Sequence, residues 1–243
     1  METGKTGKYF QYAIGEIVLV VIGILIALQI NNWNLSKQDA IFERKIIFEL
    51  KKTIESDLDG FKESEKRIIR KDQAIDSILM HRNKLINLSE KELRKHHIRV
   101  GLGILLSYDK AVFETLKNSG LQKINSDTLK KVITRFYEVN LPRYHEFVDD
   151  NYNYYKPLSL ELLKKLKQIR FYEDFFQTSK NSKGYYIRRK YDFSKIHSEE
   201  YKNYLLLHAN YKLDDWYRVK SLIKKTEGVL DLINKEIEQR YKD

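Results

Sequence analysis

One uninterrupted apolar run near the N-terminus constrains the fold of this chain more than any other feature. Residues 9–30 read YFQYAIGEIVLVVIGILIALQI, and every position from Ile17 to Leu28 is apolar. A helix rises about 1.5 Å per residue, so roughly twenty such residues cross the ~30 Å hydrocarbon layer of a bilayer. A helix that packs on the surface of a soluble protein keeps a polar face, which this run lacks. The run therefore predicts one membrane-spanning helix.

A cleaved signal peptide is the alternative explanation of such a run. Signal peptides have a shorter apolar core that ends in a cleavage site of small residues. Here the run ends in LQINNWN at residues 28–34, which offers no such site. We therefore expect an uncleaved anchor, and divide the chain into a short tail (1–8), an anchor with its interfacial flank (9–34) and a helical extramembrane domain (35–243).

The anchor also carries a resemblance to a known family. The segment YAIGEIVLVVIGILIALQINNWN at residues 12–34 resembles the signature of a large family of single-pass bacterial membrane proteins, common in flavobacteria and known only as a domain of unknown function. A weaker likeness covers Phe113 to Tyr137, where family members also show a Ser-Gly turn followed by a helix that ends in tyrosine. The resemblance implies a bacterial inner-membrane protein, but it implies no activity, cofactor or site.

Charges on the two sides of the anchor bear on its orientation, because positive charge near a membrane tends to stay cytoplasmic. Lys5, Lys8 and the amino terminus precede the run. Lys37, Arg44 and Lys45 follow it, so the balance is nearly even. Members of the similar family carry longer basic N-termini, which favours a cytoplasmic N-terminus and a periplasmic domain. The absence of cysteine is compatible with either side.

Glu16 is the one ionisable residue inside the span. A carboxyl group in hydrocarbon costs a few kcal/mol unless it is shallow, paired or protonated. Tyr9 and Tyr12 before it and Trp33 after the run match the aromatic belts of a membrane helix. Glu16 would then lie about one helical turn below the headgroups. A role in helix association, ion passage or partner docking is the functional alternative.

Small residues in the anchor favour self-association. Gly15, Gly23 and Ala27 are small, and Gly23 and Ala27 form a small-x-x-x-small pattern that permits close helix contact. Together with Glu16 they predict a homo-oligomer. A pore, in which Glu16, Gly23 and Gln29 face a shared axis, is the alternative of a different class.

A long helix is predicted directly after the anchor. Between residues 35 and 86 there is no proline, and the only glycine is Gly60. Apolar residues at spacings of three and four form a seam at Ile47, Leu50, Ile54, Phe61, Ile68, Ile75, Ile78 and Leu85. Polar residues interrupt this seam at Asp57, Ser64, Lys71 and Arg82. The pattern predicts an amphipathic helix that is continuous with the anchor.

A second long helix is predicted at the C-terminus. Ser198 followed by Glu199 and Glu200 is a typical helix start, with a hydroxyl cap and acids in the first turn. The apolar seam continues at Trp216, Val219, Ile223, Leu230, Ile233 and Ile237. We expect the two long helices to pack antiparallel. The predicted class is all-α: a transmembrane helix that continues into a long-helix bundle or an antiparallel coiled-coil-like domain.

The middle of the chain predicts shorter helices. One covers Tyr108 to Asn118 and stops at Gly120, and another runs from Ser126 to Tyr137. Pro142 should kink or end it, and Leu158 to Ile169 should form a further helix. Residues 101–106 are apolar but too short to recross the membrane, so we expect a buried connector.

No catalytic or metal chemistry is evident. GKTGK at residues 4–8 lacks the length and context of a phosphate loop, and His145-Glu146 lacks the second histidine of a zinc helix. His96-His97 and Ser119 have no partner motif either. We therefore expect no cofactor, no metal and no enzyme. A membrane-bound hydrolase would require a clustered acid, base and nucleophile.

All of the net charge of +11 lies beyond the anchor. Its densest basic group is the tyrosine-interleaved set Lys183, Arg188, Arg189 and Lys190, within a predicted hairpin at 178–195. A solvated loop is sufficient to explain such a group. As a binding surface near a membrane, it is expected to meet anionic headgroups or an acidic envelope protein rather than nucleic acid. The hypothesis from sequence is a membrane-anchored scaffold or sensor-like interaction protein of the bacterial cell envelope.

Overall fold

The structure, a computed structural model, describes the backbone of residues 4–166, 171–172, 177–178, 185–186, 189–190 and 193–241. Side chains are described for residues 14–166 and 193–241. Helices make up nearly all of this described chain, which confirms the predicted all-α class.

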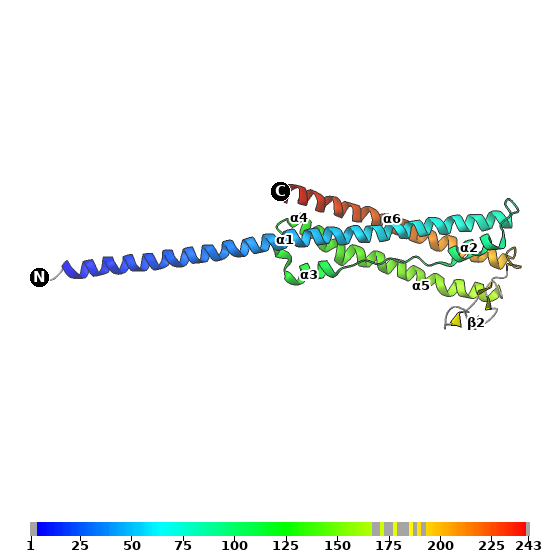
Figure 1. The fold of residues 1–243 in the computed structure, drawn as a ribbon, viewed down its shortest axis with the longest axis horizontal. Helices are drawn as coiled ribbons and strands as arrows, with labels where there is room; N and C mark the ends of the chain where they lie inside the picture. The colour runs from blue at the N-terminus through cyan, green and yellow to red at the C-terminus, as the bar shows by residue number, and fades with distance from the viewer. Residues whose placement is uncertain are drawn as a thin grey trace.

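Helix α1 (Gly4–Arg82) is a single helix of 79 residues, so the predicted continuity of the anchor with the next helix is confirmed. Its first part, residues 4–38, projects alone and is called the stalk below (Figure 1). From Asp39, which pairs with Lys123 at 3.3 Å, α1 packs against the rest of the described chain, which is called the head. The chain leaves α1 at Arg82, so Leu85 lies beyond the helix and is exposed.

Helix α6 (Glu199–Arg240) runs back along α1 in the opposite direction, as predicted (Figure 1). It begins where the sequence indicates: the Ser198 hydroxyl accepts a hydrogen bond from the Tyr201 amide at 3.2 Å. Helix α5 (Leu141–Lys165) is the third long helix of the bundle and packs on α6.

Three short helices and a 3₁₀ turn link the long ones. Helix α2 (Glu90–Gly101) starts with a capping box of Ser89 and Glu92. Helix α3 (Ala111–Ser119) ends at Gly120, whose φ of 104° suits glycine alone. It starts three residues later than predicted, because residues 102–110 are not helical and the Asp109 side chain accepts a hydrogen bond from the Ala111 amide at 2.8 Å. The 3₁₀ turn η1 (Leu121–Lys123) follows.

The α-helix that begins at Asp127 is interrupted before Pro142, as expected, but the chain remains helical. Helix α4 (Asp127–Arg135) passes through a π-helical turn, η2 (Phe136–Asn140), directly into α5. In η2 the Leu141 amide bonds to the Phe136 carbonyl five residues back. This wider turn makes room for the proline ring, which would clash with the carbonyl four residues before it in a regular helix. Residues 158–165 are helical as predicted, but they belong to α5, which continues through Pro157; the predicted end at Ile169 lies outside the described residues.

Four two-residue strands lie between α5 and α6. β1 (Phe171–Tyr172) pairs antiparallel with β4 (Arg189–Lys190). β2 (Gln177–Thr178) pairs antiparallel with β3 (Tyr185–Tyr186). The predicted hairpin is therefore present, but its outer ladder begins at Phe171, before the predicted range.

Two apolar clusters form the core of the head. The larger one contains Phe61, Ile68, Phe136 and Tyr211, and the distal one contains Ala74, Ile78, Tyr204 and Leu205. On each of α1 and α6, the buried residue between the two clusters is polar: Lys71 on α1 and His208 on α6. A polar layer therefore separates the two apolar parts of the bundle.

Candidate functional site

Three of the four polar residues that interrupt the apolar seam of α1 are buried, and the fourth, Arg82, is half-exposed. Asp57 is 8% exposed, Ser64 5% and Lys71 2%. Residues seven apart share one line on a helix, and this line carries Glu43, Leu50, Asp57, Ser64, Lys71 and Ile78. Four of the six positions are polar, so the seam contains a regular set of buried hydrogen-bonding groups.

These groups bind the backbone of the non-helical segment 102–110, which is called the connector from here on, and of Val100 just before it. The Asp57 carboxylate accepts a hydrogen bond from the Asp109 amide at 3.1 Å, and the Ser64 hydroxyl donates to the Leu105 carbonyl at 2.8 Å. The Lys71 ammonium donates to the carbonyls of Val100 (2.5 Å) and Leu102 (2.9 Å).

The spacing of these contacts follows from helix geometry. Seven helical residues rise about 10.5 Å, a distance that an extended chain covers in three or four residues at about 3.3 Å each. The connector therefore runs antiparallel to α1 and meets one polar side chain per heptad. Side chains of α1 thus supply the connector with hydrogen bonds that a neighbouring strand would supply in a β-sheet. The predicted burial of the connector is confirmed at Ile104 and Leu106, while Leu102 and Leu105 are exposed.

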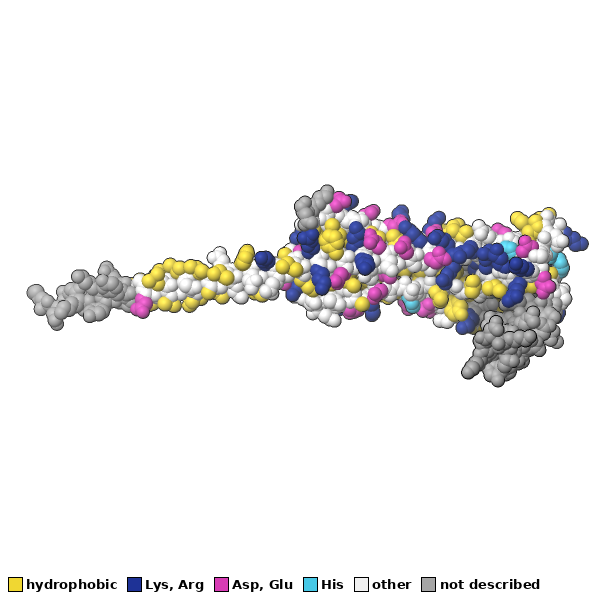
Figure 2. Space-filling model, in the orientation of Figure 1, with side chains coloured by type: hydrophobic (Ala, Val, Ile, Leu, Met, Phe, Trp, Pro, Cys, Tyr) yellow, Lys and Arg dark blue, Asp and Glu magenta, His cyan; other side chains and the backbone are white. Residues whose placement is uncertain are grey.

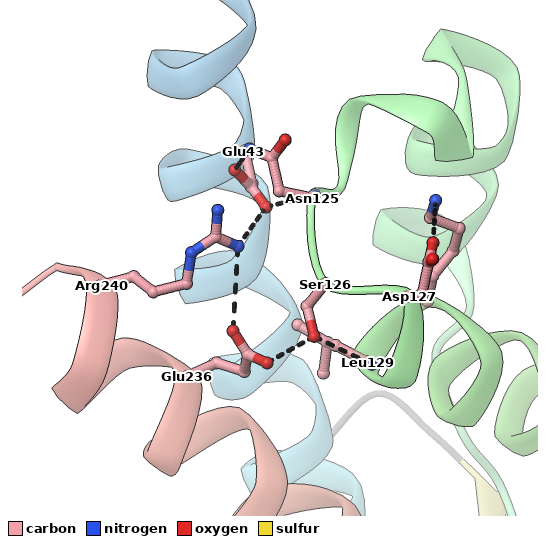
Figure 3. A network of polar contacts seen from close by, with 8 residues as sticks. Glu43, Asn125, Ser126, Asp127, Leu129, Glu236 and Arg240 are labelled. Carbon is pink, nitrogen blue, oxygen red and sulfur yellow. Dashed lines mark hydrogen bonds and ion pairs between the residues drawn. The ribbon is translucent and has the colours of Figure 1, made fainter.

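Glu43, the first polar residue on this line, ties three helices together near the stalk (Figure 3). Its carboxylate accepts hydrogen bonds from the Asn125 amide and side chain, each at 2.7 Å, and from Arg240 at 3.0 Å. Glu236 joins the same group by accepting a hydrogen bond from Ser126, the N-cap of α4. The end of α6 and the start of α4 are thus fixed to α1.

The polar layer around Lys71 is the most unusual electrostatic environment in the described head. Its ammonium lies 4.8 Å from the centre of the Tyr211 ring, and Asp215 nearby is fully buried. Asn151 donates to Asp215 at 2.8 Å, and the Ile104 amide donates to the Tyr211 hydroxyl at 2.9 Å. The layer links α1, the connector, α5 and α6.

Burial shifts the titration of the layer strongly. Desolvation lowers the pKa of Lys71 to about 7, although Asp215 opposes the shift. Desolvation raises the pKa of Asp215 to about 6, and that of Asp57 also to about 6. The pKa of His208 falls far below its usual range because it is buried near Lys71, so this imidazole is neutral at physiological pH.

We expect the stability of the head to rise from about pH 7 to about pH 9 because of Lys71. In this range the folded protein releases the Lys71 proton, whereas the unfolded chain keeps it up to its ordinary pKa of 10.5. Since the unfolded state binds more protons, stability should rise by on the order of 1 kcal/mol per pH unit. Urea unfolding at several pH values measures this slope.

The variant Lys71→Met should abolish that slope, because it keeps the length of the side chain and removes the titrating group. The exposed Lys66→Met should retain it. A slope that is unchanged in Lys71→Met would contradict the assignment. Below this range the buried carboxyls act oppositely: stability should fall as pH rises from 3.8 to about 6 through Asp57 and Asp215.

A pocket lies beside the polar layer, where α1, α2 and the connector meet. It encloses about 330 Å³ and is lined by Arg67, Arg70, Lys71, Arg99, Leu102, Gly103 and Ile104. Four of these seven residues are cationic and none is acidic. Figure 2 shows Lys and Arg side chains gathered over this half of the head, away from the stalk. We call this site the arginine pocket.

Sequence reasoning missed the arginine pocket. Its residues come from two basic stretches, KRIIRK at 66–71 and RKHHIR at 94–99, which are far apart in the chain. Each stretch alone is typical of a solvated helix face. A repeated spacing of three or four between the basic residues was the available signal, but only folding places the two stretches side by side.

The structure places the predicted association residues on the exposed stalk. At 100° per residue, Gly23 and Ala27 each lie within about 20° of Glu16, and these three residues are called the stripe below. Gly15 lies about 100° from Glu16 and so falls outside the stripe. A Cβ atom added at Gly23 would meet no atom within 4 Å in the single chain.

The predicted interfacial anchors fall on both sides of the described boundary. Trp33 is 66% exposed, and the Lys37 ammonium lies 5.4 Å from its ring centre. Tyr9 and Tyr12 are in α1, but their side chains lie outside the described residues.

The side chains of the predicted basic surface lie outside the described residues. Lys183 and Arg188 lie outside the described residues, as do the side chains of Arg189 and Lys190 in β4.

Within the part of the chain that has described side chains, no group of three or more His, Asp or Glu residues is arranged to hold a metal ion. His145 pairs with Asp149 at 3.4 Å, and His97 bonds to the Tyr201 hydroxyl at 3.0 Å. His145 and His97 thus have polar partners, whereas the buried Nδ1 of His96 has no hydrogen-bond partner among the described residues. In comparisons with known proteins, no family model, no curated protein and no solved structure matches this chain.

Proposed function

We propose that this protein is a membrane-anchored helical interaction protein of the bacterial cell envelope, a scaffold or sensor-like module that self-associates. One observation carries the proposal: the apolar segment and the main core helix of the head are the same helix, α1. Binding or movement at the head therefore acts directly on the segment that lipid would surround. The resemblance of residues 12–34 to bacterial membrane proteins agrees with this placement.

The stalk supports membrane insertion by its exposure. It is long and apolar enough to cross a membrane, with a window of mean hydropathy 2.3 of which none is buried in the structure. Ile17, Leu19 and Ile30 are each more than 60% exposed. A core helix of a soluble protein would bury such residues. Lipid is the solvent that removes this surface from water.

The stripe supports self-association through the anchor. Small residues at Gly23 and Ala27 permit close approach of a second helix, and Glu16 on the same side gains a polar neighbour there. In this arrangement Glu16 leaves the lipid-facing surface. The same geometry would line a pore if several copies assembled around one axis.

The variant Gly23→Leu should abolish self-association, because its side chain occupies the space a partner helix needs. The single chain has room for that side chain, so the fold of the head should not change. Cross-linking in lipid vesicles, at several protein-to-lipid ratios, measures the oligomer. Val21→Leu, on the opposite side of the helix, is the matched control and should leave the oligomer intact. Equal amounts of cross-linked oligomer in both variants would contradict the role of the stripe in self-association.

Topology and pore formation are tested separately. The sequence lacks cysteine, so Asn83→Cys, in the exposed loop after α1, provides a unique thiol at the far end of the head. Labelling by a membrane-impermeant maleimide in intact cells would support a periplasmic head, and labelling only after lysis would contradict it. Ion conductance of vesicles that is lost in Glu16→Gln would favour the pore over the scaffold.

A further inference from the structure

We propose that the arginine pocket binds a small, soluble phosphate-bearing anion with at least two negative charges. The inference deepens the proposed interaction function, on which it rests, by naming a ligand class. It stands on the lining of the pocket, on the absence of an ion-pair partner for two of its three arginines among the described side chains, and on its distance from the bilayer.

The lining itself carries four basic residues and no acidic one. Arg67, Arg70 and Lys71 are spaced three and four apart, which places them on one side of α1, and Arg99 faces them from α2. Like charges at such spacings destabilise a helix, so folding stability does not account for the cluster. Residues that oppose stability together around a hollow are typical of a binding site.

Only one of the three arginines is satisfied by a carboxylate. Arg70 forms an ion pair with Glu63 and also donates to the Lys66 carbonyl at 3.1 Å. Arg67 and Arg99 have no ion-pair partner among the described side chains. Lys71 is held inward by the carbonyls of Val100 and Leu102. Two guanidinium groups are therefore available for a ligand, and the Lys71 side chain lies beside them in the lining.

The geometry favours phosphate. A guanidinium group donates two parallel hydrogen bonds, and a tetrahedral phosphate presents oxygens to several such groups from different directions. A carboxylate offers two oxygens in one plane, which suits a single arginine better. The volume of about 330 Å³ lies at the lower end of the range for small-molecule sites. A compact ligand with two phosphate groups matches both the charge and the size.

The distance of the pocket from the membrane favours a soluble ligand over a lipid headgroup. Arg67 lies 34 residues beyond Trp33 on the same unbroken helix, which corresponds to about 50 Å along its axis. If Trp33 marks the membrane surface, phosphates of the anchoring bilayer do not reach the pocket of an upright chain. A diffusing phosphate compound does.

The experiment measures pyrophosphate binding to the full chain in neutral detergent by calorimetry, at about 0.1 M salt. We expect saturable binding of one pyrophosphate per chain. The double variant Arg67→Gln/Arg99→Gln should weaken it about tenfold or more, because two charge-assisted contacts are lost. The matched variant Lys66→Gln/Lys95→Gln removes the same charge from the same two helices outside the pocket, and should change affinity less than about threefold.

Thermal melting separates ligand loss from misfolding. Without ligand, neither double variant should melt below the unaltered chain, since the four substituted side chains are exposed or half-exposed. Pyrophosphate should raise the melting temperature of the unaltered chain and of the lysine variant, but not that of the arginine variant. Absence of saturable binding, or equal weakening in the two double variants, would overturn the proposal.

Competition with lipid vesicles tests whether the bound phosphate group belongs to a lipid or to a soluble compound. Phosphatidylglycerol vesicles should not compete with pyrophosphate for the chain held in neutral lipid nanodiscs, and competition would overturn the soluble ligand. Cross-linking of the anchor should be the same for the arginine variant and the unaltered chain. Failure of pyrophosphate binding with an intact oligomer would therefore reject the ligand and leave the proposed function standing.

Discussion

Arginine at both Val21 and Leu25 should move this protein from the membrane fraction to the soluble or aggregated fraction. Val21 is 47% exposed and Leu25 57%, and both lie in the middle of the apolar run. Each arginine at the centre of a membrane helix costs about 2.5–3.5 kcal/mol of insertion free energy, so the pair removes roughly 5–7 kcal/mol. Carbonate extraction of cell membranes followed by immunoblotting measures the distribution.

The matched control is Ile69→Arg with Met80→Arg, on the head portion of the same helix. These residues are 43% and 46% exposed, comparable to the pair in the stalk. Both variants add the same charge to α1, but only the stalk pair should lose membrane association. If neither pair changes extraction, the stalk is not what anchors the protein.

Phe61→Ala should destabilise the head by about 3–5 kcal/mol, because it leaves a cavity in the larger apolar cluster. Phe61 is 1% exposed and belongs to the same seam as Asp57 and Ser64, which hold the connector. Its loss should therefore also loosen the connector. The change is measured by urea unfolding of the full chain in detergent, together with hydrogen exchange of the Leu106 and Asp109 amides.

Ile69→Ala is the control for the core prediction. Ile69 lies on the same helix but is 43% exposed, so its truncation should cost about 1 kcal/mol or less. Equal destabilisation by the two variants would show that the packing assigned to Phe61 is incorrect.

The long helices were predictable because their signals are local and repeated. The apolar seam of α1 indicates a helix through Ile78, and Ser198 with two acids marks the start of α6. Each of these signals acts through side chains that are neighbours on one helix. The course of the chain past Pro142 was not predictable in this way, since it depends on the wide turn at Phe136–Asn140.

The polar interruptions of the seam show the limit of pattern reading. When α1 is considered alone, its apolar face is interrupted by Asp57, Ser64 and Lys71. Their hydrogen-bond partners lie 29–52 residues later in the chain, in and beside an extended segment with no periodicity of its own. Burial of a polar group is stable only when such a partner is present, and the partner is a tertiary feature.

By itself, the sequence determined that the chain has an apolar stalk, that the stalk continues into an amphipathic helix, and that a second long helix returns along it. These properties follow from composition and from spacing within one helix. Only the tertiary structure decided that Lys71 is buried and that Arg67 and Arg99 meet at one pocket. Burial and charge density depend on which distant segments come together, and no local spacing encodes that.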